Sequence, residues 1–491
     1  MKMQNNLGRD AVNLTLSKVI ALGITMLSSM LLSRFRTLEE YGTYSQLMLV
    51  VQLAISIFTL GLPNSINFFL ARTESSNERK NFLSTYYIFN TCLCVIMGLI
   101  LFLLSPIVVK YFNNNAIKNF IYVLLILPWA TVIMSSIENI LIVYKKTVNL
   151  ILFRVSNSIL LLIVIIVAVI FQLSFNIYMI MYVAVQSLYA IIVYFFVYKL
   201  ENRLKLSVDK KLIYKILKFS IPLGLATMVG TISIEIDKLL VGAFYSTDQL
   251  AIYTNASKEM PVTIIASSLT AVLMPKLVRL LKNGKNNEVV KLWGETIILS
   301  YVFICFFTAF LFVFAPQIME VLYSEKYLPG VNIFRIYSIV LLLRVTYFGM
   351  VLNSIGKTKM IFYCSIASLL LNVVFNFLFL YLFGMSGPAI ATFLSILIVN
   401  LVQLIFTSHY LKISFKKLFP WHSLGIITIF NVILGSCFYF IQGWMSIERL
   451  YGSIVEAIIL GSIWLAIYIL VFFRLIKKSW NSINENIVER D

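Results

Sequence analysis

Charged side chains are scarce in this sequence. Only 12% of its 491 residues are Asp, Glu, Lys or Arg, whereas 60% are hydrophobic and the mean hydropathy is +0.91. About a quarter of the residues in an ordinary soluble domain are charged. This deficit excludes a chain made of water-soluble domains, so the surface of the folded protein must face lipid.

Side chains suited to catalysis are also few. The two histidines, His409 and His422, flank one predicted loop, and no Ser/His/Asp or paired-carboxylate constellation is apparent. Residues 355–358 (Ile-Gly-Lys-Thr) resemble the end of a phosphate-binding loop, but Val351 occupies the position of its first glycine. We expect no enzymatic activity, no catalytic residue, no ATP hydrolysis and no cofactor. Energy for any transport would come from an ion, the membrane potential or the substrate gradient.

The five cysteines fall inside apolar runs, where a thiol behaves as a small hydrophobic group. Cys92 and Cys94 are two residues apart and would point to different sides of a helix. No histidine is near enough in the sequence to complete a metal site with them. We therefore expect neither a disulfide nor a bound metal.

Basic residues outnumber acidic residues by 40 to 21, which gives a formal net charge of +19. Most of these cations lie in short loops between apolar runs, without the basic stripe or aromatic motif of nucleic-acid-binding proteins. Their placement argues against nucleic acid as a partner. It indicates instead how the chain is oriented in a membrane.

Apolar runs of about 20 residues, long enough to cross a hydrocarbon core of about 30 Å, recur fourteen times. They are too long and too uniformly apolar to be barrel strands. These spans 1 to 14 lie at roughly 11–33, 44–71, 82–105, 119–142, 149–172, 176–198, 219–243, 251–275, 293–315, 331–354, 360–383, 388–410, 422–441 and 453–473. The sequence thus predicts an all-α polytopic membrane protein with about 14 transmembrane helices.

The orientation follows from the basic residues in alternate loops. One set of loops and both termini carry 28 Lys and Arg residues, and the other set carries six. Cytoplasmic loops hold the excess of Lys and Arg in membrane proteins, so both termini are predicted to be cytoplasmic. The N-terminal apolar run follows Lys2 and Arg9 but is full length and has no cleavage site after it, so we interpret it as a retained span.

One motif occurs twice, at equivalent places in the predicted topology. Residues 37–44 (Thr-Leu-Glu-Glu-Tyr-Gly-Thr-Tyr) follow span 1, and residues 246–253 (Ser-Thr-Asp-Gln-Leu-Ala-Ile-Tyr) follow span 7. Both fit [ST]-x-[DE]-x-x-[GA]-x-Y. Six spans separate the copies, so the two halves have the same orientation, as in a parallel repeat with the substrate site at the repeat interface.

This repeat predicts two six-helix lobes followed by two C-terminal helices. The predicted parts are an N-terminal lobe at 1–200 with spans 1 to 6, a basic cytoplasmic linker at 201–218, a C-terminal lobe at 219–411 with spans 7 to 12, and spans 13 and 14 with a cytoplasmic tail at 412–491.

Several local patterns, spread along the chain, resemble one transporter family. They are residues 32–44 between spans 1 and 2, 236–242 and 251–253 around the second motif, the asparagine-containing stretch 371–377 of span 11, and the glycine-containing stretch 383–392 before span 12. In order and with this span number, the chain resembles an oligosaccharide flippase of the polysaccharide-transport family. The superfamily of that family also contains multidrug exporters and the lipid II flippase.

The resemblance implies a two-lobed bundle that alternates between inward and outward openings in the bacterial plasma (inner) membrane. It implies an undecaprenyl-diphosphate-linked oligosaccharide as substrate, with its head group in a polar cavity between the lobes and its tail in lipid. A polymerase and other polysaccharide-assembly proteins are possible partners, along with membrane lipids. The alternatives are a cation-coupled multidrug exporter of the same superfamily and a lipid II-type flippase.

Ionisable side chains inside a bilayer are costly, so each one is a candidate for function. Arg344 lies almost at the middle of span 10, where it must face a wet cavity or a partner, and its forked donors suit a diphosphate. Lys18 lies on a polar face of span 1 with Thr15, Thr25 and Ser29. Snorkelling accounts for charges nearer the span ends, namely Glu138, Arg154, Glu295, Arg335 and Glu456.

Spans 7 and 8 supply the remaining candidates. Lys238 and Lys258 join Arg344 and Lys18 as cations for the head group. Glu235, Asp237 and Glu259 are candidates for a gate or for ion pairs between helices, for example Glu235 or Asp237 with Lys258. The cations among these deep charges favour an anionic head group over the organic cations of a multidrug exporter.

Overall fold

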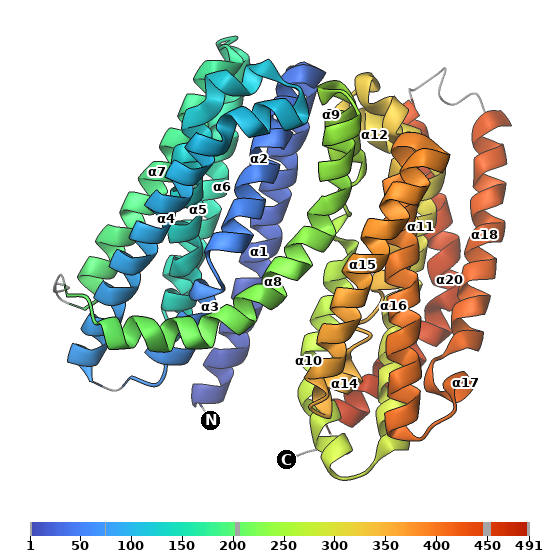
Figure 1. Cartoon of the computed structure of the whole chain (residues 1–491). Helices are drawn as coiled ribbons and strands as arrows, with labels where there is room; N and C mark the ends of the chain where they lie inside the picture. The colour runs from blue at the N-terminus through green and yellow to red at the C-terminus, as the bar shows by residue number, and fades with distance from the viewer. Residues whose placement is uncertain (1, 74, 202–206, 445–452, 489–491) are drawn as a thin grey trace. The chain divides into compact units, whose positions relative to one another are not determined.

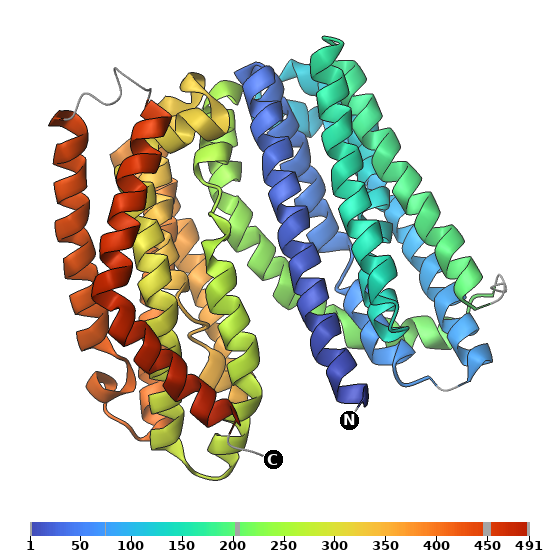
Figure 2. The ribbon, with the colours of Figure 1, turned by 180° about the vertical axis from the view of Figure 1, so that it is seen from behind.

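The computed structural model describes residues 2–73, 75–201, 207–444 and 453–488. Within these ranges all regular structure is helical, and no strand occurs. Contacts divide the chain into two compact units, residues 1–251 and 252–491. Each unit is described separately (Figures 1 and 2).

The helices account for the predicted membrane crossings. Thirteen helical segments of the described chain are long and apolar enough to cross a membrane, and one of them, Thr358–Leu411, contains two successive helices. This agrees with the fourteen predicted spans and confirms the all-α polytopic fold class.

The first unit is a helical bundle with one short helix, α3, and one 3-10 turn, η1. Its elements are α1 (Lys2–Phe35), α2 (Leu38–Phe58), α3 (Leu62–Leu70), α4 (Ser76–Phe112), η1 (Asn115–Phe120), α5 (Ile121–Val143), α6 (Thr147–Ile170), α7 (Phe175–Leu200) and α8 (Lys210–Phe244), followed by α9 (Thr247–Ala256), which crosses the boundary between the units. Its core contains buried apolar side chains of α3, α4, α5 and α7, among them Leu62, Leu83, Ile133 and Val193.

The second unit contains more short elements. They are η2 (Pro261–Thr263), α10 (Ile264–Lys282), α11 (Asn286–Val313), α12 (Ala315–Tyr323), η3 (Glu325–Gly330), α13 (Val331–Val340), η4 (Leu341–Arg344), α14 (Met350–Ser354), α15 (Thr358–Phe383), η5 (Gly384–Ser386), α16 (Gly387–Leu411), α17 (Phe415–Leu418), α18 (Trp421–Trp444) and α20 (Ser453–Val488). Most of the length of α11 is buried, and it packs against α10, α13, α18 and α20. It is therefore the central helix of this unit.

The predicted linker 201–218 is helical in its second part. Residues 202–206 lie outside the described residues, and α8 begins at Lys210, where the carboxylate of Asp209 caps the helix by accepting from the amides of Lys211 and Leu212. Both views show α8 running first across the ends of neighbouring helices of the first unit and then turning along them. Pro222 lies inside this helix, and an internal proline is a usual cause of such a bend.

A cluster of polar side chains ties α4, α7 and the α5–α6 turn together. The Glu201 carboxylate accepts from Arg79 Nε and Ser76 Oγ at 2.8 Å each, and from Tyr144 Oη at 2.5 Å. Burial disfavours the charged carboxylate, but these hydrogen bonds outweigh it and hold the pKa of Glu201 below its ordinary value. Glu201 therefore stays ionised and fixes this end of the bundle.

The two copies of the repeated motif form the same helix cap. At the start of α2, the Glu40 amide donates to Thr37 Oγ1 and the Thr37 amide donates to the Glu40 carboxylate, both at 3.1 Å. Before α9, Ser246 and Gln249 make the same reciprocal pair at 3.2 and 3.0 Å. The repeat therefore encodes a capping box at each place. Superposition of the two complete lobes about the membrane normal stays a prediction, as do their boundaries.

Within each unit, the loops of the basic set gather at one end. In the first unit these are the N-terminus and the connections α3–α4, α5–α6 and α7–α8, and in the second unit α10–α11, α14–α15 and α16–α18 (Figure 1). The alternation expected from the charge count thus has a structural counterpart. That this end is cytoplasmic stays a prediction.

We expect a cysteine at position 326 to react with an impermeant thiol reagent in intact cells, and a cysteine at position 145 to be protected. Lys145 belongs to the basic set of loops and Lys326 to the other set. The variants are made in a chain whose five native cysteines are replaced by alanine, and permeabilised cells show that both sites can react. Equal labelling of both positions in intact cells would contradict the topology.

Candidate substrate site at two interrupted helices

Span 8 is interrupted at its candidate residues. We expected a continuous helix over 251–275, but α9 ends at Ala256 and regular α-helix resumes only at Ile264. The interruption precedes Pro261, which lacks an amide donor and disfavours the helical conformation of the residue before it. Met260 is accordingly extended, with φ −67° and ψ 143°. Lys258 and Glu259 lie within this break.

Span 10 is also interrupted, where we expected one helix over 331–354. α13 passes into the 3-10 turn η4, which ends at Arg344, and the chain is then irregular until α14 begins at Met350. Two side chains hold this break. Asn400 Nδ2 donates to the carbonyl oxygen of Leu343 at 2.9 Å, and Trp293 Nε1 donates to Thr346 Oγ1 at 3.0 Å. Irregular backbone at membrane depth is tolerated where protein or a wet cavity satisfies its polar groups.

The structure brings the two breaks together through an ion pair. Arg344 Nη2 lies 2.8 Å from Glu259 Oε1, and the elements η2 and η4 contact each other. The side chains remain 40% and 31% exposed, respectively, so the pair is only partly covered. Pairing lowers the cost of holding both charges at membrane depth, and the exposure leaves the guanidinium accessible to a ligand.

Lys258 is the second cation of this site. Its Nζ donates to Asn255 Oδ1 at 2.9 Å and lies 5.8 Å from the centre of the Tyr323 ring. Because Lys258 and Glu259 are adjacent in the same break, the interruption of span 8 positions both charges. Lys258 is thus the neighbour in sequence of Glu259, the ion-pair partner of Arg344.

The candidates of the first unit fall into two places. Lys18 is an exposed residue of α1, next to the buried Ser17. Arg154 of α6 lies 3.5 Å from Ser17 Oγ and forms a 2.8 Å ion pair with Glu138 of α5. Glu138 and Arg154 thus have a structural partner in each other.

The remaining candidates lie on α8. Lys238 and Glu235 form a 2.8 Å ion pair one turn apart, so Lys238 carries its own neutralising partner. Asp237 is almost fully buried, at 1% exposure. A cavity that contains the cations of both units stays a prediction.

Two aspects of the site were missed in the sequence. The sequence predicted that Arg344 faces a wet cavity or a partner but did not identify the partner, which is Glu259 in the break of span 8. Pro261 was the available signal for that break. Asn400 and Trp293 gave no signal, because an asparagine or tryptophan in an apolar run is common. Glu456 also differs from expectation, since it is fully buried and does not snorkel to an interface.

Span 2, which occupies the same place in the repeat as span 8, is interrupted as well. α2 ends at Phe58, and Leu60 and Gly61 then adopt left-handed backbone conformations with φ of 47° and 70°. Gly224 of α8 packs directly on this turn: a Cβ there would lie 2.2 Å from the carbonyl carbon of Leu60. The close approach requires glycine at position 224.

The described residues offer no cluster of carboxylate, histidine and cysteine side chains for a metal site. Over the described ranges, no group of three or more such residues is placed to hold a metal ion. The five cysteines are free thiols.

Charged breaks inside the spans of a helical bundle are a feature of many membrane transporter folds, in which discontinuous helices carry the binding site. The chain belongs to the polysaccharide biosynthesis protein family, whose model matches residues 31–332. This confirms the family-level resemblance seen in the sequence. A comparison with curated proteins gives no match.

Solved structures of two related kinds share the fold. The lipid II flippase MurJ in an inward closed conformation has a TM-score of 0.75 and 17% identity, over 94% of this chain and 100% of that chain. An inward-facing multidrug resistance MATE family transporter of the MOP superfamily has a TM-score of 0.66 and 15% identity, over 81% and 99%. At these identities the likeness establishes the fold alone: the chain is a multi-pass membrane protein with the helical fold of these two structures.

Proposed function

We propose that the chain moves an undecaprenyl-diphosphate-linked oligosaccharide from the cytoplasmic to the outer leaflet of the bacterial plasma membrane by alternating access. The observation that carries this proposal is Arg344, an exposed cation at the end of a helix interrupted at predicted membrane depth. Its planar fork can donate two parallel hydrogen bonds to a diphosphate. The family description and the lipid-linked substrate named for MurJ support the same substrate class.

In this proposal, Glu259 competes with the diphosphate of the substrate for the guanidinium of Arg344. Its carboxylate holds Arg344 while the site is empty, and the diphosphate displaces it because a diphosphate carries more charge and more acceptor oxygens than one carboxylate. Lys258 in the same break adds a second positive charge. Exchange of partners at Arg344 would then couple head-group binding to movement of the two breaks.

The first unit contributes Lys18 as a further head-group cation. Lys238 contributes less than Lys18, because Glu235 neutralises it within the same helix. Asp237 remains a candidate for the gate. The polymerase and other assembly proteins would receive the sugar chain after transfer.

Reconstituted vesicles distinguish this function from its alternatives. A fluorescent polyprenyl-diphosphate oligosaccharide is placed in one leaflet of the vesicles. We expect the full chain to move it to the other leaflet, where an impermeant quencher can reach it. Empty vesicles and vesicles with lipid II as substrate run in parallel. Faster movement of lipid II would indicate a lipid II-type flippase. Gradient-driven uptake of a cationic dye, with no lipid movement, would indicate a multidrug exporter.

A further inference from the structure

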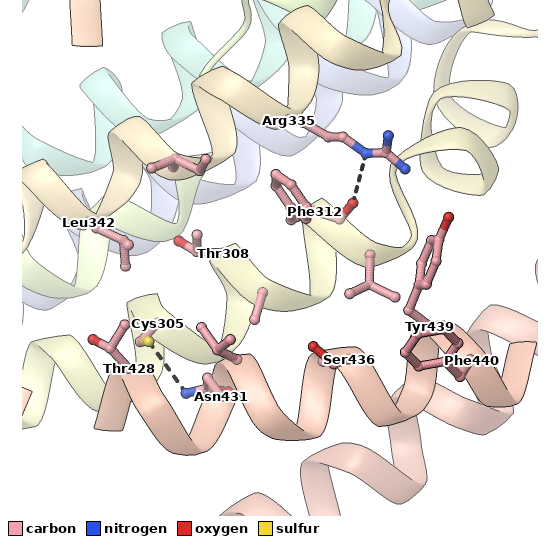
Figure 3. Close-up of a pocket in the computed structure, with 15 residues that line it drawn as sticks. Cys305, Thr308, Phe312, Arg335, Leu342, Thr428, Asn431, Ser436, Tyr439 and Phe440 are labelled. Carbon is pink, nitrogen blue, oxygen red and sulfur yellow. Dashed lines mark hydrogen bonds between the residues drawn. The ribbon is translucent and has the colours of Figure 1, made fainter. Parts of the chain in front are cut away.

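A pocket of about 610 Å³ lies within the second unit between α11, α13 and α18 (Figure 3). Apolar side chains form much of its wall, including Phe312 and Val313 of α11, Ile339 of α13, and Val432 and Phe440 of α18. The volume falls in the range of pockets that enclose a small ligand. None of Lys258, Glu259 and Arg344 lines it, although Leu342 of η4 does.

One end of the pocket carries a cation. Arg335 Nε donates to the carbonyl oxygen of Phe312 at 3.2 Å, and its guanidinium carbon lies 5.4 Å from the centre of the Phe312 ring. Figure 3 shows the two terminal nitrogens of Arg335 turned away from Phe312, with the Tyr439 hydroxyl at the same end. Arg335 and Tyr439 thus both line the pocket.

The pocket is open along α18. Val432, Tyr439 and Phe440 line it and are nevertheless 61%, 55% and 73% exposed. Apolar residues so exposed on a membrane-spanning helix face lipid tails. A ligand can therefore enter sideways from the bilayer without crossing water.

The inner end of the pocket is polar. Thr308 Oγ1 and Asn431 Oδ1 both line it and are buried, and within the described part of the chain neither atom has a hydrogen-bond partner. Asn431 Nδ2 donates to Cys305 Sγ at 3.3 Å, which fixes the amide there. These two atoms keep hydrogen-bonding capacity at this end of the pocket.

We propose that this pocket binds one anionic glycerophospholipid of the surrounding membrane. The phosphate accepts hydrogen bonds from Arg335 and Tyr439, and one acyl chain lies along α11 and α18 toward Thr308 and Asn431. The cation selects an anionic head over a zwitterionic one by charge. A pocket of about 610 Å³ suits one acyl chain better than the much longer polyprenyl chain of the proposed substrate.

Native mass spectrometry of the purified full chain, delipidated and titrated with defined lipids, tests the proposal. We expect one dioleoyl phosphatidylglycerol to bind with at least about tenfold preference over dioleoyl phosphatidylcholine, the size of one charge-assisted contact. Arg335→Gln should remove that preference and Arg335→Lys should keep part of it. Ser436→Phe, which adds bulk to the pocket wall from an exposed position, should lower the binding of both lipids.

Lys326→Gln is the matched control, because it removes a cation nine residues before Arg335 that does not line the pocket, and it should bind lipid normally. Melting curves of each variant without lipid show whether the fold is intact. Equal affinity for both lipids, or phosphatidylglycerol binding unchanged by both Arg335→Gln and Ser436→Phe, would overturn the proposal. So would displacement of phosphatidylglycerol by equimolar polyprenyl phosphate, which would assign the pocket to the carrier lipid. Lipid binding is read without transport, so failure here leaves the proposed function untouched.

Discussion

Arg344→Ala is expected to reduce polysaccharide export by about a hundredfold per folded molecule, the effect of losing a charged hydrogen-bonding partner from a desolvated site. Arg344→Lys keeps the charge but loses the planar fork, so it should retain part of the export. Lys18→Ala should lower export less, because Lys18 offers a point charge on an exposed helix face. Export is measured as surface polysaccharide divided by the amount of folded protein in the membrane.

The normalisation separates a binding role from a structural one. If Arg344 only stabilises the break in span 10, Arg344→Ala lowers folded yield while each surviving molecule exports at the normal rate. Lys326→Ala serves as the control cation outside the site and should change neither quantity. Unchanged export per molecule in both Arg344→Ala and Lys18→Ala would rule out the role of these cations in head-group binding.

Exchanging the charges of the Glu259–Arg344 pair is expected to separate folding from transport. Glu259→Arg alone leaves like charges facing each other across the two breaks, and Arg344→Glu alone does the same, so each should lower folded yield. The double variant restores an ion pair and should restore most of that yield. It should still export at least about tenfold less, because the guanidinium now lies on the other break and the head group has lost its aligned donor.

A third variant tests the competition directly. Glu259→Gln removes the competing charge, so the purified protein should bind a soluble diphosphate probe more tightly than the parent does, while transport slows because release is impaired. The exchange Lys285→Glu with Glu288→Lys is the matched control, since that 2.9 Å pair is half exposed and lies at the α10–α11 connection. It should behave like the parent protein. Full export by the Glu259/Arg344 double exchange would show that the pair is only structural.

The fold was predictable because its signals are local and repeated. Each crossing needs about 20 apolar residues, which can be recognised in the sequence. The described helices agree with the predicted number of crossings once the two successive helices within Thr358–Leu411 are counted separately. Each capping box, at Thr37 and at Ser246, is formed by two residues three positions apart in the sequence. The motif alone was therefore sufficient to predict this helix cap. Helix continuity was predicted less well. Hydropathy alone does not distinguish a continuous span from two half-helices joined by an irregular turn, as in spans 2, 8 and 10.

By itself, the sequence determined that this chain lives in a membrane, how many times it crosses, which loops share a side and which charges are too deep to be incidental. Those properties depend on the free-energy cost of placing charges and backbone polar groups in hydrocarbon. That cost can be read from each segment of the sequence separately. Only the tertiary structure showed that Arg344 pairs with Glu259, and that Asn400 and Trp293 hold the break in span 10. Only the tertiary structure showed that α11, α13 and α18 line a pocket together with Arg335. Partners 85 residues apart, such as Glu259 and Arg344, are chosen by packing. No local pattern records packing between distant segments.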